Sequence, residues 1–231
     1  MGKIHKQLVI AIDGPAGSGK STVSKIIAQK LGLMYIDTGA MYRALTLKAV
    51  RQNLDLRDEK ALAKLACSTR VDLEEEGGSL KVVLDGEDVA SLIRTPELTN
   101  NVKYIACVPG VRKEMVKSQR SIGERLGAVL EGRDIGTVVF PDADYKFYLD
   151  ADADERARRR HKELAKTGMN VNLNELKKDV LSRDESDMKR SVGALKKAPD
   201  AIFIDTTDLT IDDVTEKVLS YIKVRGEDSI S

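Results

Sequence analysis

The chain has 231 residues, of which 42% are hydrophobic and 32% are charged. This length suits one α/β domain with inserted pieces better than two small domains, and the hydrophobic fraction can fill a sizeable core. The net charge of +1 gives no overall field that would attract a nucleic acid polymer or an anionic membrane, so we expect neither partner. Any binding of anions by basic residues must therefore depend on a local cluster of them.

The two cysteines, Cys67 and Cys107, have neither metal-ligand nor redox spacing, and each lies in an apolar helical context. We expect both to be buried thiols in a reducing compartment. The apolar run after the charged N-terminal segment covers only residues 8–12, which is too short for a signal sequence or a membrane span. These features predict a cytoplasmic protein.

An apolar stretch of strand length, Leu8–Asp13, runs directly into Gly14-Pro-Ala-Gly-Ser-Gly-Lys-Ser21. The pattern Gly-x-x-x-x-Gly-Lys-Ser between a strand and a helix is typical of the phosphate-binding loop of nucleoside triphosphatases and kinases. The helix is predicted to begin at about Lys20 and to end at Gly32, so its positive dipole end faces the same anion.

The residue types of this loop explain its chemistry. Glycines let successive backbone N–H groups turn inward onto phosphate oxygens. Lys20 adds a positive charge for the β- and γ-phosphates, and the Ser21 hydroxyl can take one position on Mg²⁺. We expect the nucleotide to be bound by Gly14, Pro15, Ala16, Gly17, Ser18, Gly19, Lys20, Ser21 and Thr22.

A short second strand, Leu33–Asp37, leads into a helix for which Thr38 is a natural cap. Tyr42 and Arg43 fall in the first turns of that helix. Because the segment follows a strand beside the phosphate loop, we expect it at the carboxyl edge of a parallel sheet, where α/β proteins bind ligands.

The pattern changes between residues 70 and 90. Arg70–Glu75 and Leu80–Leu84 are strand-like and are joined through Gly77-Gly78, and Asp85-Gly86 is a hairpin signal before a third short strand. This segment predicts a small antiparallel insert.

A helix capped by Thr95 and a basic helix follow, and then a third core strand, Ala128–Glu131. The strand breaks at Gly132-Arg-Asp-Ile-Gly136, so Arg133 and Asp134 are also expected at the ligand edge of the sheet. Tyr145–Leu149 and Ala201–Asp205 are the fourth and fifth core strands.

A helical hairpin is predicted to begin at Asp154 and to turn at 168–172. Two sets of side chains each share one face: Arg156, Arg159 and Arg160 on the first helix, and Arg183, Asp187 and Arg190 on the second. The arginines could simply pair with neighbouring carboxylates. Two facing arginine stripes beyond a phosphate loop favour instead a lid that closes on phosphates.

Five strands alternating with helices predict a parallel, doubly wound α/β core with extra pieces after the second and fourth strands. A phosphate loop alone permits GTPase switches, motors and small-molecule kinases. The chain has no Asn-Lys-x-Asp motif for reading guanine and no strand that ends in Asp-Glu, as a motor usually has.

The surplus of arginines suits a reaction in which donor and acceptor are both anionic phosphates, because their repulsion must be neutralised before transfer. An acceptor phosphate oxygen is already nucleophilic at pH 7. Such a reaction needs no general base, and neither His5 nor His161 is placed to be one.

Four segments, in this order and spacing, closely resemble the bacterial cytidylate kinases: Gly14-Pro-Ala-Gly-Ser-Gly-Lys-Ser21, Asp37-Thr-Gly-Ala-Met-Tyr-Arg43, Gly132-Arg-Asp-Ile-Gly-Thr-Val-Val-Phe-Pro-Asp142 and Arg183-Asp-x-x-Asp187-x-x-Arg190. The resemblance covers nearly the whole chain, insert included. It implies one P-loop kinase domain (1–231), with an acceptor nucleotide-binding region (37–112), a β insert (about 70–90) and a helical lid (154–192). It also implies transfer of the ATP γ-phosphoryl group to CMP or dCMP with Mg²⁺.

Residue by residue, the resemblance places around the acceptor nucleotide Thr38, Tyr42, Arg43, Arg112, Arg133 and Asp134. Arg133 and Arg43 would hold its phosphate. Where relatives have a serine that helps to read cytosine, this chain has Lys103, which shifts the expected base contact to Arg112.

The resemblance also assigns the lid residues. Arg183 and Arg190 would approach the acceptor from the lid side, and Asp187 would contact the sugar or orient those arginines. Arg159 would close over the donor phosphates. The catalytic residues are then Lys20, Arg133, Arg159, Arg183 and Arg190.

Two alternatives stay open on the sequence. One is another kinase of small anionic metabolites, such as an adenylate- or thymidylate-type enzyme, and the other is an ATP-operated switch or binding module. We expect a monomer, from the family and from the absence of an obvious large apolar stripe.

Overall fold

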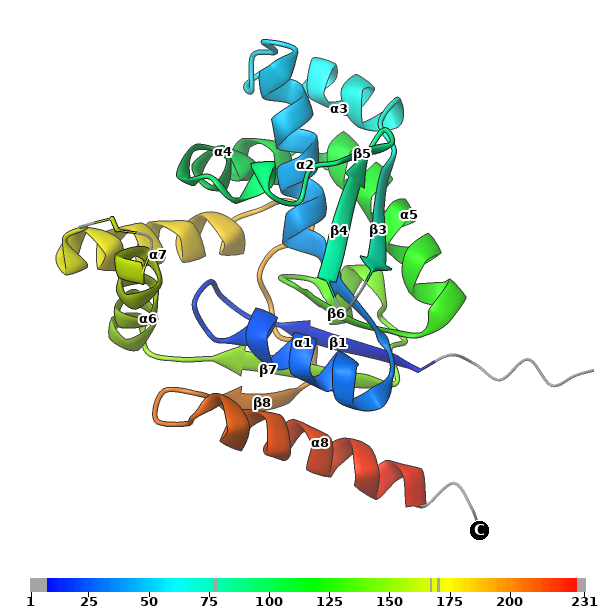
Figure 1. Ribbon diagram of the computed structural model, residues 1–231, viewed down its shortest axis with the longest axis vertical. Helices are drawn as coiled ribbons and strands as arrows, with labels where there is room; N and C mark the ends of the chain where they lie inside the picture. Colours follow the sequence, from blue (N-terminus) through cyan, green and yellow to red (C-terminus); the bar gives the residue numbers. More distant parts are fainter. Residues whose placement is uncertain (1–7, 77–78, 167, 170, 228–231) are drawn as a thin grey trace, which may run out of the picture.

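Five parallel strands form the main sheet of the computed structural model, which describes residues 8–76, 79–166, 168–169 and 171–227 (Figure 1). The order is β2-β6-β1-β7-β8. The strands are β1 (Val9–Asp13), β2 (Met34–Asp37), β6 (Ala128–Gly132), β7 (Tyr145–Asp150) and β8 (Ile202–Asp205). All five predicted core strands are confirmed, within one residue at each end.

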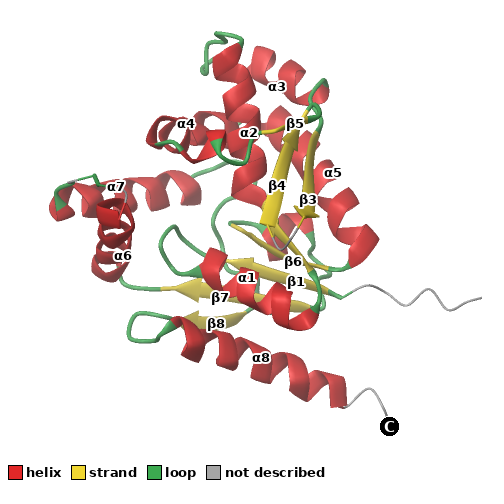
Figure 2. Ribbon diagram, in the orientation of Figure 1, coloured by secondary structure: helices red, strands yellow, loops and turns green. Residues whose placement is uncertain are grey.

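The central strand β1 is buried on both faces, which is why its sequence is apolar without alternation. Ile10 and Ile12 pack with α1 (Lys20–Leu31) and α8 (Ile211–Glu227), and Val9 and Ala11 face the opposite side. That side is covered by α2 (Thr38–Arg51) and α5 (Pro109–Leu126). The result is a sheet between two helical layers, as a doubly wound core requires (Figure 2).

The predicted ends of the first helix are confirmed. Gly32 has a φ of 64°, and its N–H donates to the carbonyls of Ala28 and Gln29, so α1 ends in the left-handed conformation that glycine favours. The predicted cap of α2 is wrong. Asp37, not Thr38, accepts the hydrogen bond from Ala40 N, because Thr38 is already helical and its hydroxyl donates to Glu131 O at 2.7 Å.

The insert is a separate antiparallel sheet in the order β3-β4-β5, as expected. After α3 (Glu59–Cys67) come β3 (Val71–Glu76), β4 (Ser79–Leu84) and β5 (Glu87–Asp88). Asp85 and Gly86 have φ values of 50° and 94°, the conformation of the two-residue hairpin that Asp-Gly predicts. The predicted Gly77-Gly78 connection lies outside the described residues. Figure 2 shows this sheet beside α2, α3 and α5.

The turn η1 (Leu92–Arg94) and α4 (Pro96–Ala106) follow the insert. Thr95 caps α4 by accepting from Leu98 N at 3.3 Å, as predicted. The predicted burial of the two cysteines is wrong. Cys67 ends α3 and Cys107 follows α4, and both are exposed because helix ends reach the solvent there.

Beyond β6, the turn η2 (Ile135–Val139) leads to β7, and β7 runs into the predicted helical hairpin of α6 (Ala153–Lys166) and α7 (Leu173–Met188). Figure 1 shows this hairpin beside the carboxyl end of β7. Arg190 lies beyond the end of α7 rather than within it. Residue 170 of the predicted turn lies outside the described residues, as do residues 167 and 228–231.

The last helix, α8, is capped by Thr210, whose hydroxyl accepts from Asp213 N at 3.2 Å. Among the residues that the structure describes, no helix combines the length and apolar character needed to cross a membrane.

Candidate active site

The phosphate loop joins β1 to α1 in a conformation that depends on glycine. A Cβ on Gly14, whose φ is 146°, would lie 1.9 Å from Leu149 O, and Gly17 has a φ of 82° with Arg156 Cβ close above it. Lys20 Nζ donates to Pro15 O at 2.7 Å, and Ser18 Oγ donates to the same oxygen at 3.1 Å. The loop is therefore held in shape by its own atoms before any anion arrives.

Lys20 lies in a crowded electrostatic environment. Burial and, to a smaller extent, the nearby Arg133 guanidinium lower its pKa to about 7, against the opposite effects of Glu131 and Asp13. A lysine destabilised in its charged form by a second cation is a strong site for an anion, because a phosphate relieves both effects. The loop lysine and Arg133 thus lie close enough for their charges to interact.

A cavity of about 540 Å³ opens beside the loop, a volume in the range of small-ligand sites. It is bounded by the start of α1, by α6 and by the connection from β8 to α8. Its walls include Gly17, Gly19, Lys20, Ser21, Thr22, Glu155, Arg159, Glu163, Thr207, Asp208, Leu209, Thr210 and Ile211. Sequence reasoning missed the 207–211 wall, although that segment follows a core strand at the ligand edge.

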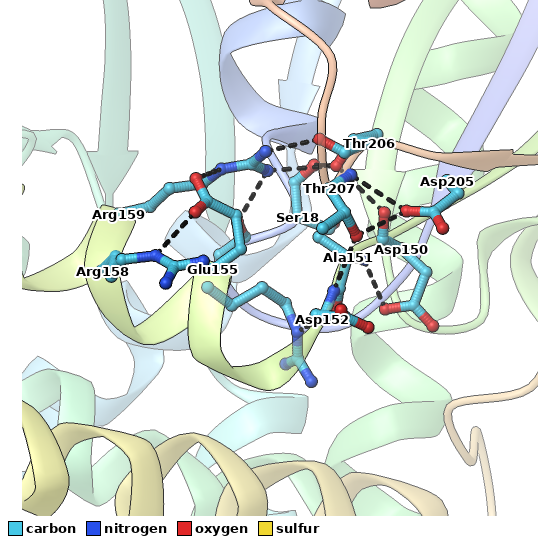
Figure 3. Close-up of polar contacts among 12 residues, drawn as sticks. Ser18, Asp150, Ala151, Asp152, Glu155, Arg158, Arg159, Asp205, Thr206 and Thr207 are labelled. Atoms are coloured by element: carbon cyan, nitrogen blue, oxygen red, sulfur yellow. Dashed lines mark hydrogen bonds and ion pairs between the residues drawn. The ribbon is translucent and has the colours of Figure 1, made fainter.

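Arg159, which lines this cavity, reaches from α6 toward Thr206 (Figure 3). Its Nη1 donates to Thr206 Oγ1 at 3.0 Å and its Nη2 donates to Thr206 O at 2.6 Å, while its Nε donates to Glu155 Oε1 at 3.1 Å. Its Nη1 also lies 3.4 Å from Gly17 O, so its charge is next to the phosphate loop.

A second group of arginines gathers around Asp187. Arg133 and Arg190 both pair with the buried Asp187, with an Arg133 Nε to Asp187 Oδ2 distance of 2.7 Å. Burial alone would raise the pKa of Asp187, but the two guanidinium groups hold it below its usual value. Arg43 pairs with Asp37 at 2.9 Å.

Arg112 and Asp134 form a further ion pair, and both side chains are almost fully buried. The Arg112 guanidinium lies 5.6 Å from the centre of the Tyr42 ring, within cation–π range. Burial raises the pKa of Asp134, and Arg112 opposes that effect. Lys103, in contrast, is exposed on α4, where its ammonium lies 5.1 Å from the Tyr104 ring centre.

Arg183 makes no hydrogen bond or ion pair with any residue that the structure describes. Burial and, to a smaller extent, the charges of Arg133, Arg43 and Arg190 lower its pKa to about 10, against the effect of Asp187. An arginine disfavoured in this way by its cationic neighbours is stabilised by an incoming anion.

The predicted arginine stripe on α6 is not a single surface. Arg156 is buried in an ion pair with Asp184 at 2.6 Å, and it also donates to Ala16 O at 3.2 Å and Ala151 O at 2.8 Å. Arg160 pairs with the exposed Glu163. Arg159 is the member of the stripe that lines the cavity beside the phosphate loop.

Asp13, which sequence reasoning missed, fixes the segment that carries Arg133. Its two carboxylate oxygens accept from Ile135 N and Gly136 N, both at 2.8 Å. Burial raises its pKa to about 6. The signal in the sequence was its position as the last residue of a buried strand beside the loop.

Glu131, also missed, lies near the end of β6 in a similar way and is buried. The Tyr35 hydroxyl donates to Glu131 Oε1 at 2.6 Å. Burial raises the pKa of Glu131, while Lys20 and a hydrogen bond with the Ser21 side chain favour its charged form.

A magnesium ion bound with nucleotide phosphates would find suitable oxygen donors here. Mg²⁺ is usually held by one or two protein oxygens, with phosphates and water completing its shell. The Ser21 hydroxyl and the Glu131 carboxylate are hard donors of this kind. The described residues contain no cluster of three or more His, Cys, Asp or Glu side chains that could hold a metal by themselves.

The sequence is closely similar to known proteins. A family model described as cytidylate kinase matches residues 10–224. A cytidylate kinase from Desulforamulus reducens is 52% identical over 214 residues, covering 93% of this chain and 96% of that protein. Cytidylate kinases from Bacillus licheniformis and Bacillus subtilis are each 48% identical, cover 97% and 96% of this chain, and are matched over 100% of their own length.

Solved structures give looser matches. A gluconokinase from Sinorhizobium meliloti 1021 has a TM-score of 0.49 and 14% identity, with 96% of this chain and 95% of that chain covered. A shikimate kinase from Bacteroides thetaiotaomicron has a TM-score of 0.49 and 12% identity, with 94% and 99% covered. The sequence comparisons, which do not depend on these matches, establish that the chain belongs to the cytidylate kinase family.

Proposed function

We propose that the chain transfers the γ-phosphoryl group of ATP to CMP or dCMP, giving CDP or dCDP. The observation that carries the proposal is the gathering of guanidinium groups beside the phosphate loop, in a member of the cytidylate kinase family. Two nucleotides that meet through their phosphates bring several negative charges together. The site offsets these negative charges with positively charged side chains on the donor side and on the acceptor side.

ATP is the donor in this proposal, and its phosphates bind the loop from Gly14 to Thr22. Backbone N–H groups and Lys20 neutralise the phosphates, as in other phosphate loops. The base enters the cavity of about 540 Å³ between α6 and the connection from β8 to α8. Arg159, at the wall of that cavity, closes over the donor phosphates.

The acceptor binds on the Arg133 side. Arg133 and Arg43 hold its phosphate, and Arg183 and Arg190 approach the same anion from the lid. Asp187 supports this arrangement because it already holds Arg133 and Arg190 in place. The base meets the residues around the buried Arg112–Asp134 pair, with Thr38 and Tyr42 completing the pocket.

The reaction needs positioning and charge neutralisation more than proton transfer. The acceptor phosphate oxygen attacks directly, so no residue has to serve as general base. Lys20, Arg159 and the acceptor-side arginines stabilise the charge on the transferring group in an environment that excludes water. Ser21, together with Glu131, would hold Mg²⁺, which would offset the negative charge of the donor phosphates.

We also propose a monomeric cytoplasmic enzyme without nucleic acid or membrane partners. The net charge of +1 and the two exposed free thiols, Cys67 and Cys107, support this setting.

Initial rates of ADP formation with a panel of nucleoside monophosphates test the proposal. With ATP and Mg²⁺, CMP and dCMP should give far faster ADP formation than AMP, TMP or no acceptor. An adenylate- or thymidylate-type enzyme would prefer AMP or TMP. An ATP-operated switch would turn over slowly whatever acceptor was present, and either result would reject the proposed activity.

A further inference from the structure

Thr206 is a buried residue that links three parts of the donor site. It directly follows β8, and its side chain is almost inaccessible, with 2% of the residue exposed. Its hydroxyl proton is shared between Ser18 O at 3.1 Å and Asp150 O at 2.9 Å. Its N–H also donates to Asp150 O, at 2.7 Å. Thr206 therefore fixes the phosphate loop to the end of β7.

The same residue holds the lid arginine. Thr206 Oγ1 and Thr206 O accept from the two terminal nitrogens of Arg159, at 3.0 Å and 2.6 Å (Figure 3). Two acceptors on one residue match the planar fork of a guanidinium group, which a lysine ammonium could not reproduce. The orientation of Arg159 is thus set by a residue that is itself attached to the phosphate loop.

We propose that Thr206 is a positioning residue for donor binding and transfer. It orients the Arg159 guanidinium toward the donor phosphates and fixes its position relative to the phosphate loop. This inference rests on the proposed function, because it takes ATP as the donor. Glu155 holds the third guanidinium nitrogen, but it lies on α6 with Arg159 and moves with it. Thr206, in contrast, belongs to the core, and its two contacts with Arg159 are shorter than the contact of that arginine with Gly17 O at 3.4 Å.

Thr206→Val tests the role of the hydroxyl at nearly constant volume. ATP affinity, measured by calorimetry without acceptor, should fall about tenfold, as expected for losing a hydrogen bond to a charged group. CMP affinity should change less than twofold, and Thr206→Ser should restore ATP binding. Thr215→Val, the same change at a buried threonine on α8, is the matched control and should bind ATP normally.

A double substitution separates positioning from general damage. If Thr206 acts through Arg159, Thr206→Val combined with Arg159→Ala should bind ATP within about twofold of Arg159→Ala alone. The inference would be overturned if the losses of ATP affinity were additive in the double variant, or if Thr206→Val bound ATP as tightly as the wild type. It would also be overturned if CMP affinity fell as much as ATP affinity, or if Thr206→Ser did not restore ATP binding.

Arg159→Lys replaces Thr206→Val as the test if the latter does not fold. It keeps the charge at the same position of α6 but cannot reach both Thr206 oxygens, so it should show the same loss confined to ATP. Normal ATP binding by Arg159→Lys would overturn the inference. Because these titrations use ATP alone, they remain informative even if the wild-type protein fails to phosphorylate CMP.

Discussion

Asp13 is a buried carboxylate that shapes the site by holding a neighbouring segment of backbone. It accepts hydrogen bonds from Ile135 N and Gly136 N, and so fixes the segment after β6 to the end of β1. Burial raises its pKa from 3.8 to about 6. The folded chain therefore binds this proton more tightly than the unfolded chain does, and Asp13 makes stability depend on pH.

The sign of that dependence gives a prediction for Asp13→Asn. A raised pKa in the folded state contributes stability that is complete below pH 3.8 and is lost as the pH rises through about 6. The wild-type advantage over Asp13→Asn in free energy of unfolding should thus shrink by about 2 kcal/mol between pH 4 and pH 7. Urea unfolding at several pH values measures it. An advantage that grows with pH would refute the assigned shift.

At the scale of elements, a buried ion pair joins the two helices of the hairpin, and its arginine also links the hairpin to the core. Arg156 on α6 pairs with Asp184 on α7 at 2.6 Å and also donates to the Ala16 carbonyl in the phosphate loop. Breaking such a pair leaves an uncompensated buried charge, which costs far more than loss of a surface pair. The two lid helices should therefore depend on Asp184 for their mutual packing.

Asp184→Asn tests this dependence. The variant keeps the side-chain shape but leaves the Arg156 charge unpaired, so it should lower the free energy of unfolding by on the order of 3 kcal/mol. Thermal or urea unfolding measures the change. Glu185→Gln is the matched control on the same helix, because Glu185 pairs with Lys189 in the solvent, and it should unfold like the wild type. Equal stability of the two variants would rule out a structural role for the buried pair.

The elements themselves were largely predictable from the sequence, because their signals are local. The glycine-rich loop, the Gly32 helix end, the Thr95 cap and the Asp85-Gly86 hairpin each depend on residues a few positions apart. The predictions were wrong where the hydrogen-bond partner of a residue comes from an element that is distant in the sequence. Thr38 carries a cap residue type, but its hydroxyl is taken by Glu131 O of the neighbouring strand.

The side-chain pairing within the site was less predictable for the same reason. Arg156 and Arg159 share one helix face, so the sequence pattern treats them alike. Only the packing of α6 against α7 and the loop decides that Arg156 is buried against Asp184 while Arg159 lines the cavity. The same holds for Asp13 and Glu131, which lie at or near the ends of continuous apolar strands. Such strands show no alternation of apolar and polar residues, so the sequence does not reveal that these two carboxylates belong to the site.

At the scale of the whole molecule, the positively charged side chains of the site come from two parts of the structure, the main sheet and the lid. Arg133 comes from the edge of the main sheet and Arg190 from the chain beyond the lid helices, and Asp187 on α7 binds both. Arg183 adds a charge without a hydrogen bond or ion pair to the described residues. This arrangement supports the proposal that the acceptor phosphate is held where the sheet edge and the lid meet.

The turnover of Arg133→Ala with CMP, saturating ATP and Mg²⁺ tests this central claim most directly. Removing one preorganised charge at the transferring phosphate should lower kcat by about 100-fold or more. The circular dichroism spectrum should stay unchanged, and Arg57→Ala, an exposed arginine between α2 and α3, should keep normal turnover. Near-normal turnover of a folded Arg133→Ala would contradict the claim.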